Sequence, residues 1–130
     1  MGVRIRDRKA LARDGAGLER HMESASRVAR EVLASPVGPY CERIILYGSC
    51  ARHEQGPSSD VDLLVVLDEE ARELGSAPLL GLYPRLSDVG RELPEPDVRF
   101  QYGDSWERDP LTYFQFIRKE GKDVWTRQAT

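Results

Sequence analysis

Two aspartates, Asp60 and Asp62, stand two positions apart at the start of an apolar segment, Val61 to Leu67. Side chains two residues apart in an extended chain project from the same face, so these carboxylates should lie close together. Their repulsion must be offset by a basic side chain or a divalent cation, and a site made only of oxygen ligands suits magnesium or manganese. For such a pair standing alone, the plainer interpretation is better: Asp60 caps a turn and Asp62 faces solvent.

A second feature, Gly48-Ser49, follows another apolar run, Arg43 to Tyr47, and lies ten residues before the aspartate pair. Glycine permits a tight turn and leaves the backbone open to a phosphate group. We predict a short helix from Ser49 to Gln55, capped by Ser49, whose exposed amides and serine hydroxyl would bind phosphate oxygens. Arg52 is a further candidate phosphate ligand, although an exposed helical arginine is the commoner explanation. The two features together make a coincidental aspartate pair less probable.

A third carboxylate, Asp97, begins a segment that runs to Tyr102 and alternates apolar with polar residues. This alternation predicts a strand with one buried face, which could bring Asp97 beside the first pair as a further metal ligand. Glu95 is its rival but lies between two prolines, which makes it a poorer candidate. Arg99, on the same strand face as Asp97, either pairs with that carboxylate, contacts substrate or is simply exposed.

The elements that must position these residues follow from periodicity and from glycine and proline. The segment 61–67 is apolar on both faces, which is typical of a central strand covered on both sides. Helical structure over 68–93 should be interrupted or kinked by Gly81 and Pro84. The other predicted elements are a helix at about 17–34, strands at 43–47 and 97–102, and a helix at about 109–120 ended by Gly121. Helices and strands mixed in this way indicate the α/β or α+β class.

The bulk composition is that of one small soluble globular domain of 130 residues, with 40% hydrophobic and 32% charged residues. The charged N-terminus lacks the apolar core of an export signal, and no apolar run could span a bilayer, so we expect a cytoplasmic protein without a membrane. Cys41 and Cys50 flank an extended segment and should be free thiols. With only His21 and His53 as histidines, a metal site built on these cysteines has little support.

Positive charge gathers at the start of the chain, where residues 1–35 carry eight Arg or Lys against five acids. A basic segment can meet nucleic acid or an acidic partner. Here the charges alternate with acids and no aromatic residue accompanies them, which is typical of a solvated helix face. We therefore expect no nucleic-acid partner.

The segment LYGSCARHEQGPSSDVDLLVV resembles the signature of the minimal nucleotidyltransferases, a family of the DNA polymerase beta-like nucleotidyltransferase superfamily. The likeness continues in Asp97-Val98 and, more loosely, in FIRKEGKDVW. It departs at His53, where the family usually has glycine. The resemblance implies a single nucleotidyltransferase domain over 1–130, with an N-terminal helical segment at 1–35 and a catalytic core at 42–125. The fold implied is a mixed β-sheet with flanking helices.

The activity implied by this resemblance is transfer of a nucleoside monophosphate from a nucleoside triphosphate, usually ATP, to an acceptor hydroxyl. Asp60 and Asp62 would hold two Mg²⁺ ions, or Mn²⁺, that clamp the triphosphate. Asp97 would bind the catalytic metal and help to deprotonate the acceptor. Gly48 and Ser49 would hold the outer phosphates, with Arg52 as the further candidate.

The acceptor implied by the family is a tyrosine of a helical HEPN-type protein encoded nearby, a toxin that the transferase silences as its antitoxin. Two alternatives stay open: an inactive subunit that neutralises a partner by binding, or transfer to a small molecule such as an antibiotic, with a homodimer forming the pocket. The aromatic residues Tyr47, Trp106 and Trp125 could stack on a base, but such residues more often fill the core.

Overall fold

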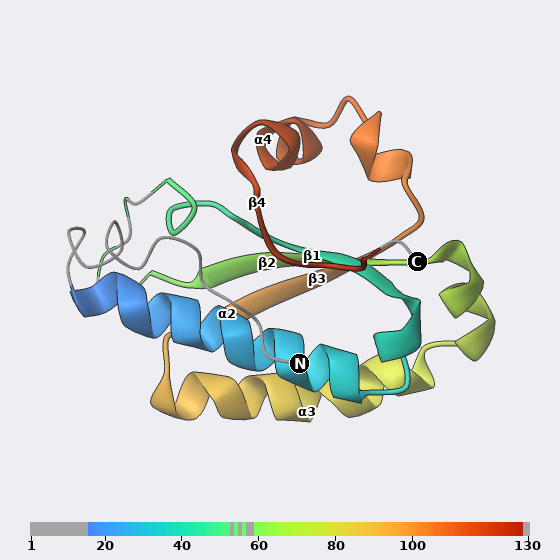
Figure 1. Ribbon diagram of the computed structural model, residues 1–130, viewed down its shortest axis with the longest axis horizontal. Coiled ribbons are helices and arrows are strands. Elements are labelled where there is room, and N and C mark those ends of the chain that lie inside the picture. The colour runs from blue at the N-terminus through green and yellow to red at the C-terminus, as the bar shows by residue number, and fades with distance from the viewer. Residues whose placement is uncertain (1–15, 53, 55, 57–58, 129–130) are drawn as a thin grey trace.

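A computed structural model describes residues 16–128 except 53, 55, 57 and 58, with side chains from residue 19 onward. The chain forms a four-stranded sheet with α-helices on both faces (Figure 1). The α-helices are α2 (Ala16–Ala34), α3 (Ala77–Glu92) and α4 (Thr112–Glu120), and the 3₁₀ helices are η1 (Gly38–Tyr40), η2 (Glu69–Leu74) and η3 (Ser105–Glu107). The strands are β1 (Cys41–Tyr47), β2 (Val61–Leu67), β3 (Pro96–Tyr102) and β4 (Lys122–Thr126). No helix in this described part is long and apolar enough to cross a membrane.

The sheet is mixed, with the strand order β3-β2-β1-β4. Strand β1 pairs antiparallel with both β2 and β4, whereas β2 and β3 run parallel and are joined through η2 and α3. Because β2 lies between β1 and β3, it is the central strand that its apolar sequence predicts, and five of its seven residues from Leu63 to Leu67 are buried in succession. The predicted mixed sheet with flanking helices in one small domain is therefore confirmed.

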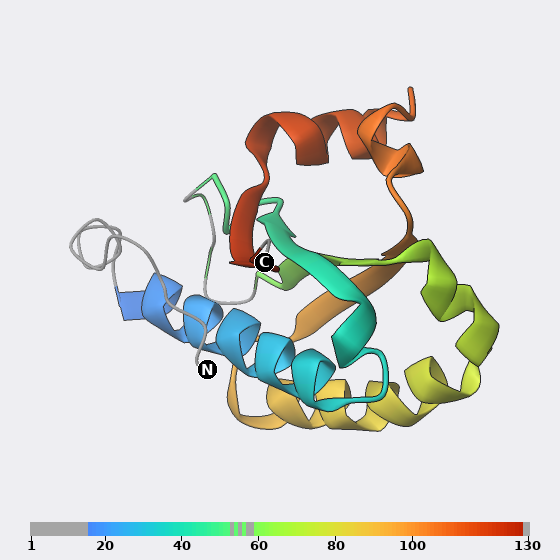
Figure 2. The same ribbon diagram turned by 45° about the vertical axis from the view of Figure 1, so that its right-hand side comes forward.

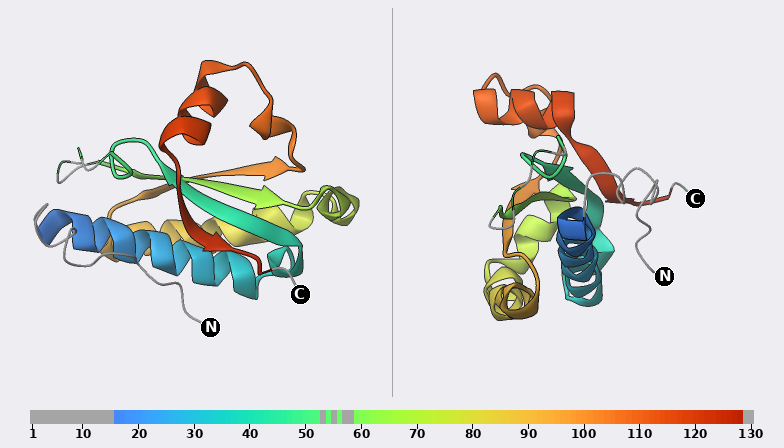
Figure 3. Two further views of the ribbon diagram at one scale, coloured as in Figure 1. Left: turned by 45° about the horizontal axis from the view of Figure 1, so that its top comes forward. Right: turned by 90° about the vertical axis from the view of Figure 1, so that its left-hand side faces the viewer.

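Alternate residues of the strands face two separate apolar layers. Helices α2 and α3 cover one face, where Leu63 and Val65 of β2 are buried. Helix α4 and η3 cover the other face, where Leu64 and Val66 are buried beside Ile117 of α4 (Figures 1 and 3). Figure 2 shows α4 and η3 together on the side of the sheet away from α2 and α3. A two-residue period along β2 thus divides the side chains between two cores.

Helix α3 runs without a break from Ala77 to Glu92, so of the predicted interruption or kink at Gly81 and Pro84 the interruption is wrong. Both residues are exposed, and water can satisfy the carbonyl that proline leaves without a partner. A buried stripe of Leu82, Leu86 and Val89 holds the opposite side of the helix on the sheet. The break in the segment 68–93 occurs earlier, at Gly75, whose φ of 73° ends η2.

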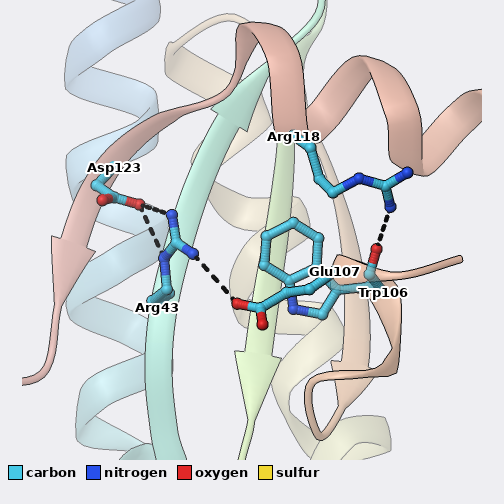
Figure 4. A network of polar contacts seen from close by, with 5 residues as sticks. All are labelled: Arg43, Trp106, Glu107, Arg118 and Asp123. Atoms are coloured by element: carbon cyan, nitrogen blue, oxygen red, sulfur yellow. Dashed lines mark hydrogen bonds and ion pairs between the residues drawn. The ribbon is translucent and has the colours of Figure 1, made fainter.

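A polar network on the α4 side of the sheet links β1 to β4 and to η3, and η3 to α4 (Figure 4). The Arg43 guanidinium of β1 donates through Nε and Nη2 to Oδ1 of Asp123 on β4, at 3.1 and 2.8 Å, and lies 5.4 Å from the centre of the Trp106 ring. Its Nη1 is 3.9 Å from Glu107 of η3, and Arg118 of α4 donates to the Trp106 carbonyl. Trp106 is buried, so it fills the core as the plainer interpretation expects.

Candidate functional site

Asp62 and Asp97 are direct neighbours across the parallel pair β2–β3, where they share one position of the register. Adjacent strands lie about 4.8 Å apart, and in-register residues of parallel strands point to the same face. Leu63 and Val98, the next pair along, belong to the core under α2 and α3. Asp62 and Asp97 consequently face the opposite side, toward α4. The structure brings together the two carboxylates that the sequence assigns to different motifs.

Gly48 lies directly against the Asp62 carboxylate. It has a φ of +76°, and a Cβ added there would come within 2.3 Å of the Asp62 Oδ2 atom. A larger residue would therefore meet both an unfavourable backbone conformation and an occupied space. The glycine that the sequence assigns to phosphate binding thus also makes room for a carboxylate.

The charge around Asp62 is predominantly negative. Burial of the carboxyl raises its pKa above the ordinary value, and the carboxylates of Asp97 and Asp60 raise it further. The guanidinium groups of Arg99 and Arg52 lower it, but these are the smaller effects. A half-buried carboxylate that is destabilised by two others is one that a bound cation would stabilise.

Asp60, just before β2, is exposed, unlike its half-buried partners. No three Asp, Glu, His or Cys side chains among the described residues are already grouped closely enough to hold a metal ion. Asp60 is near enough to raise the pKa of Asp62, and an exposed side chain can change rotamer at little cost. Asp62 and Asp97 therefore fit a divalent cation in donor type and charge, and Asp60 would complete the set by turning toward them.

The segment after Gly48 is a turn over residues 49–52, not the predicted helix from Ser49 to Gln55. The Arg52 amide donates to the Gly48 carbonyl at 3.2 Å, but the Glu54 amide reaches back five residues to Ser49, at 2.9 Å. That second bond does not continue an α-helical ladder. Any phosphate contact here would have to come from one turn and the Ser49 hydroxyl, without a helix dipole. Residues 53 and 55, including His53, lie outside the described residues.

Arg52 is held by two carboxylates. Its Nε donates to Oε2 of Glu54 at 3.0 Å, and its Nη1 donates to Oε2 of Glu120, the last residue of α4, at 3.1 Å. Both bonds raise the pKa of Arg52. Because the Arg52 charge also acts on Asp62, the guanidinium lies at the edge of the carboxylate site, where it links the turn to α4.

Tyr113 of α4 is a site residue that sequence reasoning missed. Its hydroxyl is 2.7 Å from the Tyr47 hydroxyl, and the two rings meet edge to face with centres 5.5 Å apart. The Arg99 guanidinium lies over the Tyr113 ring, 5.1 Å from its centre. Burial raises the pKa of both tyrosines, to which the charge of Asp62 adds. The phenols thus stay protonated and close the α4 side of the site; only an aromatic at the start of a predicted helix signalled this in the sequence.

Three other residues are engaged in contacts outside the proposed ligand set, and one of them, Cys50, donates its thiol to the Asp60 backbone carbonyl at 3.5 Å. Glu95 packs beside Gly90 at the end of α3, which leaves Asp97 as the third carboxylate. Trp125 packs against the core under α2 and α3. Cys50 is buried as a free thiol, as is Cys41, and burial raises the pKa of Cys50 to about 11, so it is not a thiolate nucleophile at neutral pH.

Comparison with known proteins identifies the family of this site. A sequence profile described as Nucleotidyltransferase domain matches residues 27–125, which include β1, β2 and β3 and thus every carboxylate described above. None of the curated proteins with which the sequence was compared matches it.

Several solved structures are similar to this chain. A toxin–antitoxin crystallised with AMP-PNP is 20% identical, with a TM-score of 0.53 over 82% of this chain and 74% of that one. A proposed nucleotidyltransferase from Sulfolobus solfataricus is 20% identical, with a TM-score of 0.48 over 94% of this chain and 91% of that one. A mutant of the toxin–antitoxin MntA-HpeT is 17% identical, with a TM-score of 0.47 over 76% and 70%.

Proposed function

The chain belongs to the family of nucleotidyltransferase domains, and on that premise we propose that it transfers AMP from ATP to a hydroxyl group of a partner protein in a reaction that depends on a divalent metal. The observation that carries this proposal is the in-register pair Asp62 and Asp97 beside Gly48. Two carboxylates on adjacent parallel strands, next to a glycine turn, combine a place for a cation with a place for phosphate.

The carboxylates have two roles in this reaction, proton acceptance and metal binding. Asp97 accepts the proton of the acceptor hydroxyl, whose oxygen then bonds to the α-phosphorus of ATP. The bond from that phosphorus to the bridging oxygen breaks, and pyrophosphate leaves. Mg²⁺, or Mn²⁺ in its place, would be held by Asp60, Asp62 and Asp97 and would neutralise charge on the attacking and leaving oxygens. Most of the acceleration therefore comes from positioning and electrostatics.

The triphosphate would lie along the turn after β1. The Gly48 backbone and the Ser49 hydroxyl face the outer phosphates, and Arg52 supplies a positive charge at the same edge. The Arg52 guanidinium donates hydrogen bonds to Glu54 and Glu120. Exposed ion pairs of this kind are weak, so the phosphates can displace the carboxylates from Arg52.

The proposed acceptor is a tyrosine of a helical HEPN-type toxin encoded nearby, which this chain would silence as its antitoxin. The fold neighbour crystallised with AMP-PNP is itself a toxin–antitoxin, which supports a protein partner. Interleaved charges agree with a protein rather than a nucleic-acid partner, because Arg27 and Arg85 pair with acids across the α2–α3 surface.

The test is an incubation of the full chain with ATP labelled at the α-phosphate, magnesium and the co-encoded helical protein. We expect label on a tyrosine of that protein, and a loss of about a hundredfold or more in Asp62→Asn and Asp97→Asn. Asp88→Asn is the matched control, since Asp88 is an exposed carboxylate of α3 that pairs with Arg91. Equal labelling by wild type and Asp62→Asn would contradict the proposal.

A second candidate is a subunit that neutralises its partner by binding alone. It is favoured by the lack of a ready three-ligand group among the described side chains and by the engagement of Arg52 with Glu120. Calorimetry separates the two: ATP binding that requires metal and is lost in Asp62→Asn supports transfer, whereas no binding supports the neutralising subunit. Consumption of ATP with a small hydroxyl compound and none with the protein would indicate transfer to a small molecule instead.

A further inference from the structure

A buried histidine of α2 contacts the turn that leads into Asp60. His21 is 2% exposed, and its Nε2 atom lies 3.0 Å from the carbonyl oxygen of Ser59. Because a carbonyl oxygen only accepts, Nε2 carries a proton and donates it. That carbonyl belongs to the planar peptide unit between Ser59 and Asp60. The hydrogen bond therefore fixes the orientation of the backbone from which Asp60 projects.

Ser24 makes the corresponding contact to the segment before β3. Its hydroxyl donates to the Pro94 carbonyl at 2.8 Å, and its side chain is fully buried. Pro94 lies three residues before Asp97, in a segment where neither Pro94 nor Pro96 has an N–H group. Residues three apart share one face of a helix, so His21 and Ser24 reach the two segments from the same side of α2.

The two tethered segments are also joined to each other. The Val61 amide, one residue after Asp60, donates to the Glu95 carbonyl at 2.9 Å. Gly90 of the neighbouring helix α3 packs so closely that a Cβ there would lie 3.3 Å from Glu95. Helix α2 therefore holds both of the segments that lead into the carboxylate strands β2 and β3.

The distribution of buried polar side chains singles out the same place. Among the described residues the buried polar side chains are His21, Ser24 and Ser26, all within residues 21–26 of α2. The remaining buried residues of this helix are Ala25, Val28, Ala29 and Val32. An apolar residue at position 21 or 24 would avoid the desolvation of a polar group but would leave a backbone carbonyl without its donor.

We propose that His21 and Ser24 are positioning residues of the carboxylate site. His21 fixes the orientation of the peptide from which Asp60 extends, and Ser24 fixes the position of the segment that leads to Asp97. The carboxylates can then bind one cation together. The proposal rests on the proposed function for the identity of that cation. Residues behind metal ligands commonly change metal affinity by about tenfold to a hundredfold when they are replaced.

Paired variants separate the hydrogen bond from the packing. His21→Gln keeps an N–H donor at nearly the place of Nε2, whereas His21→Met has similar bulk and no donor. Ser24→Ala removes the other bond, and Ser35→Ala is its control, because the Ser35 hydroxyl bonds the Val32 carbonyl at the far end of α2.

The measurement is Mn²⁺ binding to the full chain in the presence of an ATP analogue with a methylene group between the α and β phosphorus atoms, which cannot react. We expect His21→Met and Ser24→Ala to weaken Mn²⁺ binding by roughly tenfold or more, and His21→Gln and Ser35→Ala by less than about threefold. The Asp60 amide resonance, on the other side of the tethered peptide, should shift in His21→Met and much less in His21→Gln.

Equal Mn²⁺ affinity of wild type, His21→Met and Ser24→Ala would overturn the proposal, as would equal losses in His21→Gln and His21→Met. If His21→Met does not fold, Ser24→Ala against Ser35→Ala decides by the same criterion. A different result would contradict only the proposed transfer reaction: a wild-type chain that binds Mn²⁺ and the analogue but transfers no AMP to any acceptor.

Discussion

Replacing Gly48 by alanine should damage the carboxylate site through a single carbon atom. At a φ of +76° an L-residue costs about 1–2 kcal/mol relative to glycine. The new Cβ would also come within 2.3 Å of Oδ2 of Asp62, so that side chain must leave its rotamer, at a cost of about 0.5–1.5 kcal/mol. We expect Gly48→Ala to lower the free energy of unfolding by about 1.5–3.5 kcal/mol, and Mn²⁺ affinity by about tenfold or more because the ligand is displaced.

A double-mutant cycle with Asp62→Ala separates these two effects. Asp62→Ala removes the carboxylate but keeps its Cβ, which lies at an ordinary distance of 3.4 Å from the added carbon. In that background Gly48→Ala should cost only the backbone strain, about 1–2 kcal/mol, as urea unfolding will show. Gly75→Ala is a further control: its φ is +73° but nothing lies within 4 Å, so it should destabilise the fold without changing Mn²⁺ affinity. A coupling near zero, together with normal Mn²⁺ binding by Gly48→Ala, would refute the reasoning.

Burial and neighbouring carboxylates raise the pKa of Asp62 above 3.8, so between the unfolded and folded pKa values the folded chain binds more protons. Asp62 therefore lowers the free energy of unfolding as pH rises through that window. Asp62→Asn should resist urea better than wild type at about pH 7, but not at about pH 3. Arg52→Gln should raise the KM for ATP by roughly tenfold, whereas Glu120→Gln, which frees Arg52, should not raise it; the reverse order would contradict a phosphate role. Tyr47→Phe and Tyr113→Phe should each cost about 1 kcal/mol in urea unfolding and together less than their sum, because they share one hydrogen bond; full additivity would argue against that bond.

The carboxylate pair could be predicted from the sequence because its parts are local. An aspartate at the start of an apolar run and another at the start of an alternating run each mark the beginning of a strand. Their meeting depends on β2 and β3 being parallel neighbours, which no local pattern specifies and which the pairing of Asp62 with Asp97 shows. The roles of Asp60, Asp62 and Asp97 as metal ligands stay predictions.

The remaining contacts depend on tertiary packing. Tyr113 and Glu120 reach the site because α4 lies across the sheet, and no local pattern specifies which helix residue meets Tyr47 or Arg52. His21 has no sequence signal either, since its partner is a backbone carbonyl. The short helix after Gly48 was wrong for a related reason, because propensity alone does not decide whether one turn continues.

Turns and breaks in helices were also difficult to predict from residue type. Pro84 lies inside α3 without ending it, because its side of the helix is exposed and the opposite side is anchored by buried leucines and a valine. Gly75, in contrast, does end a helix, η2, because its positive φ turns the chain. Burial on one side of a helix thus outweighs the local preference of a proline on the other.

The central claim is that Asp62 and Asp97 together hold a divalent cation against a nucleoside triphosphate. Its most direct test is a crystal structure of the full chain with Mn²⁺ and the ATP analogue that has a methylene group between the α and β phosphorus atoms, with anomalous scattering used to locate manganese. We predict a manganese peak coordinated by carboxylate oxygens of both residues, with the triphosphate beside Gly48 and Ser49. Manganese and nucleotide bound elsewhere, with the two carboxylates free of metal, would contradict the account.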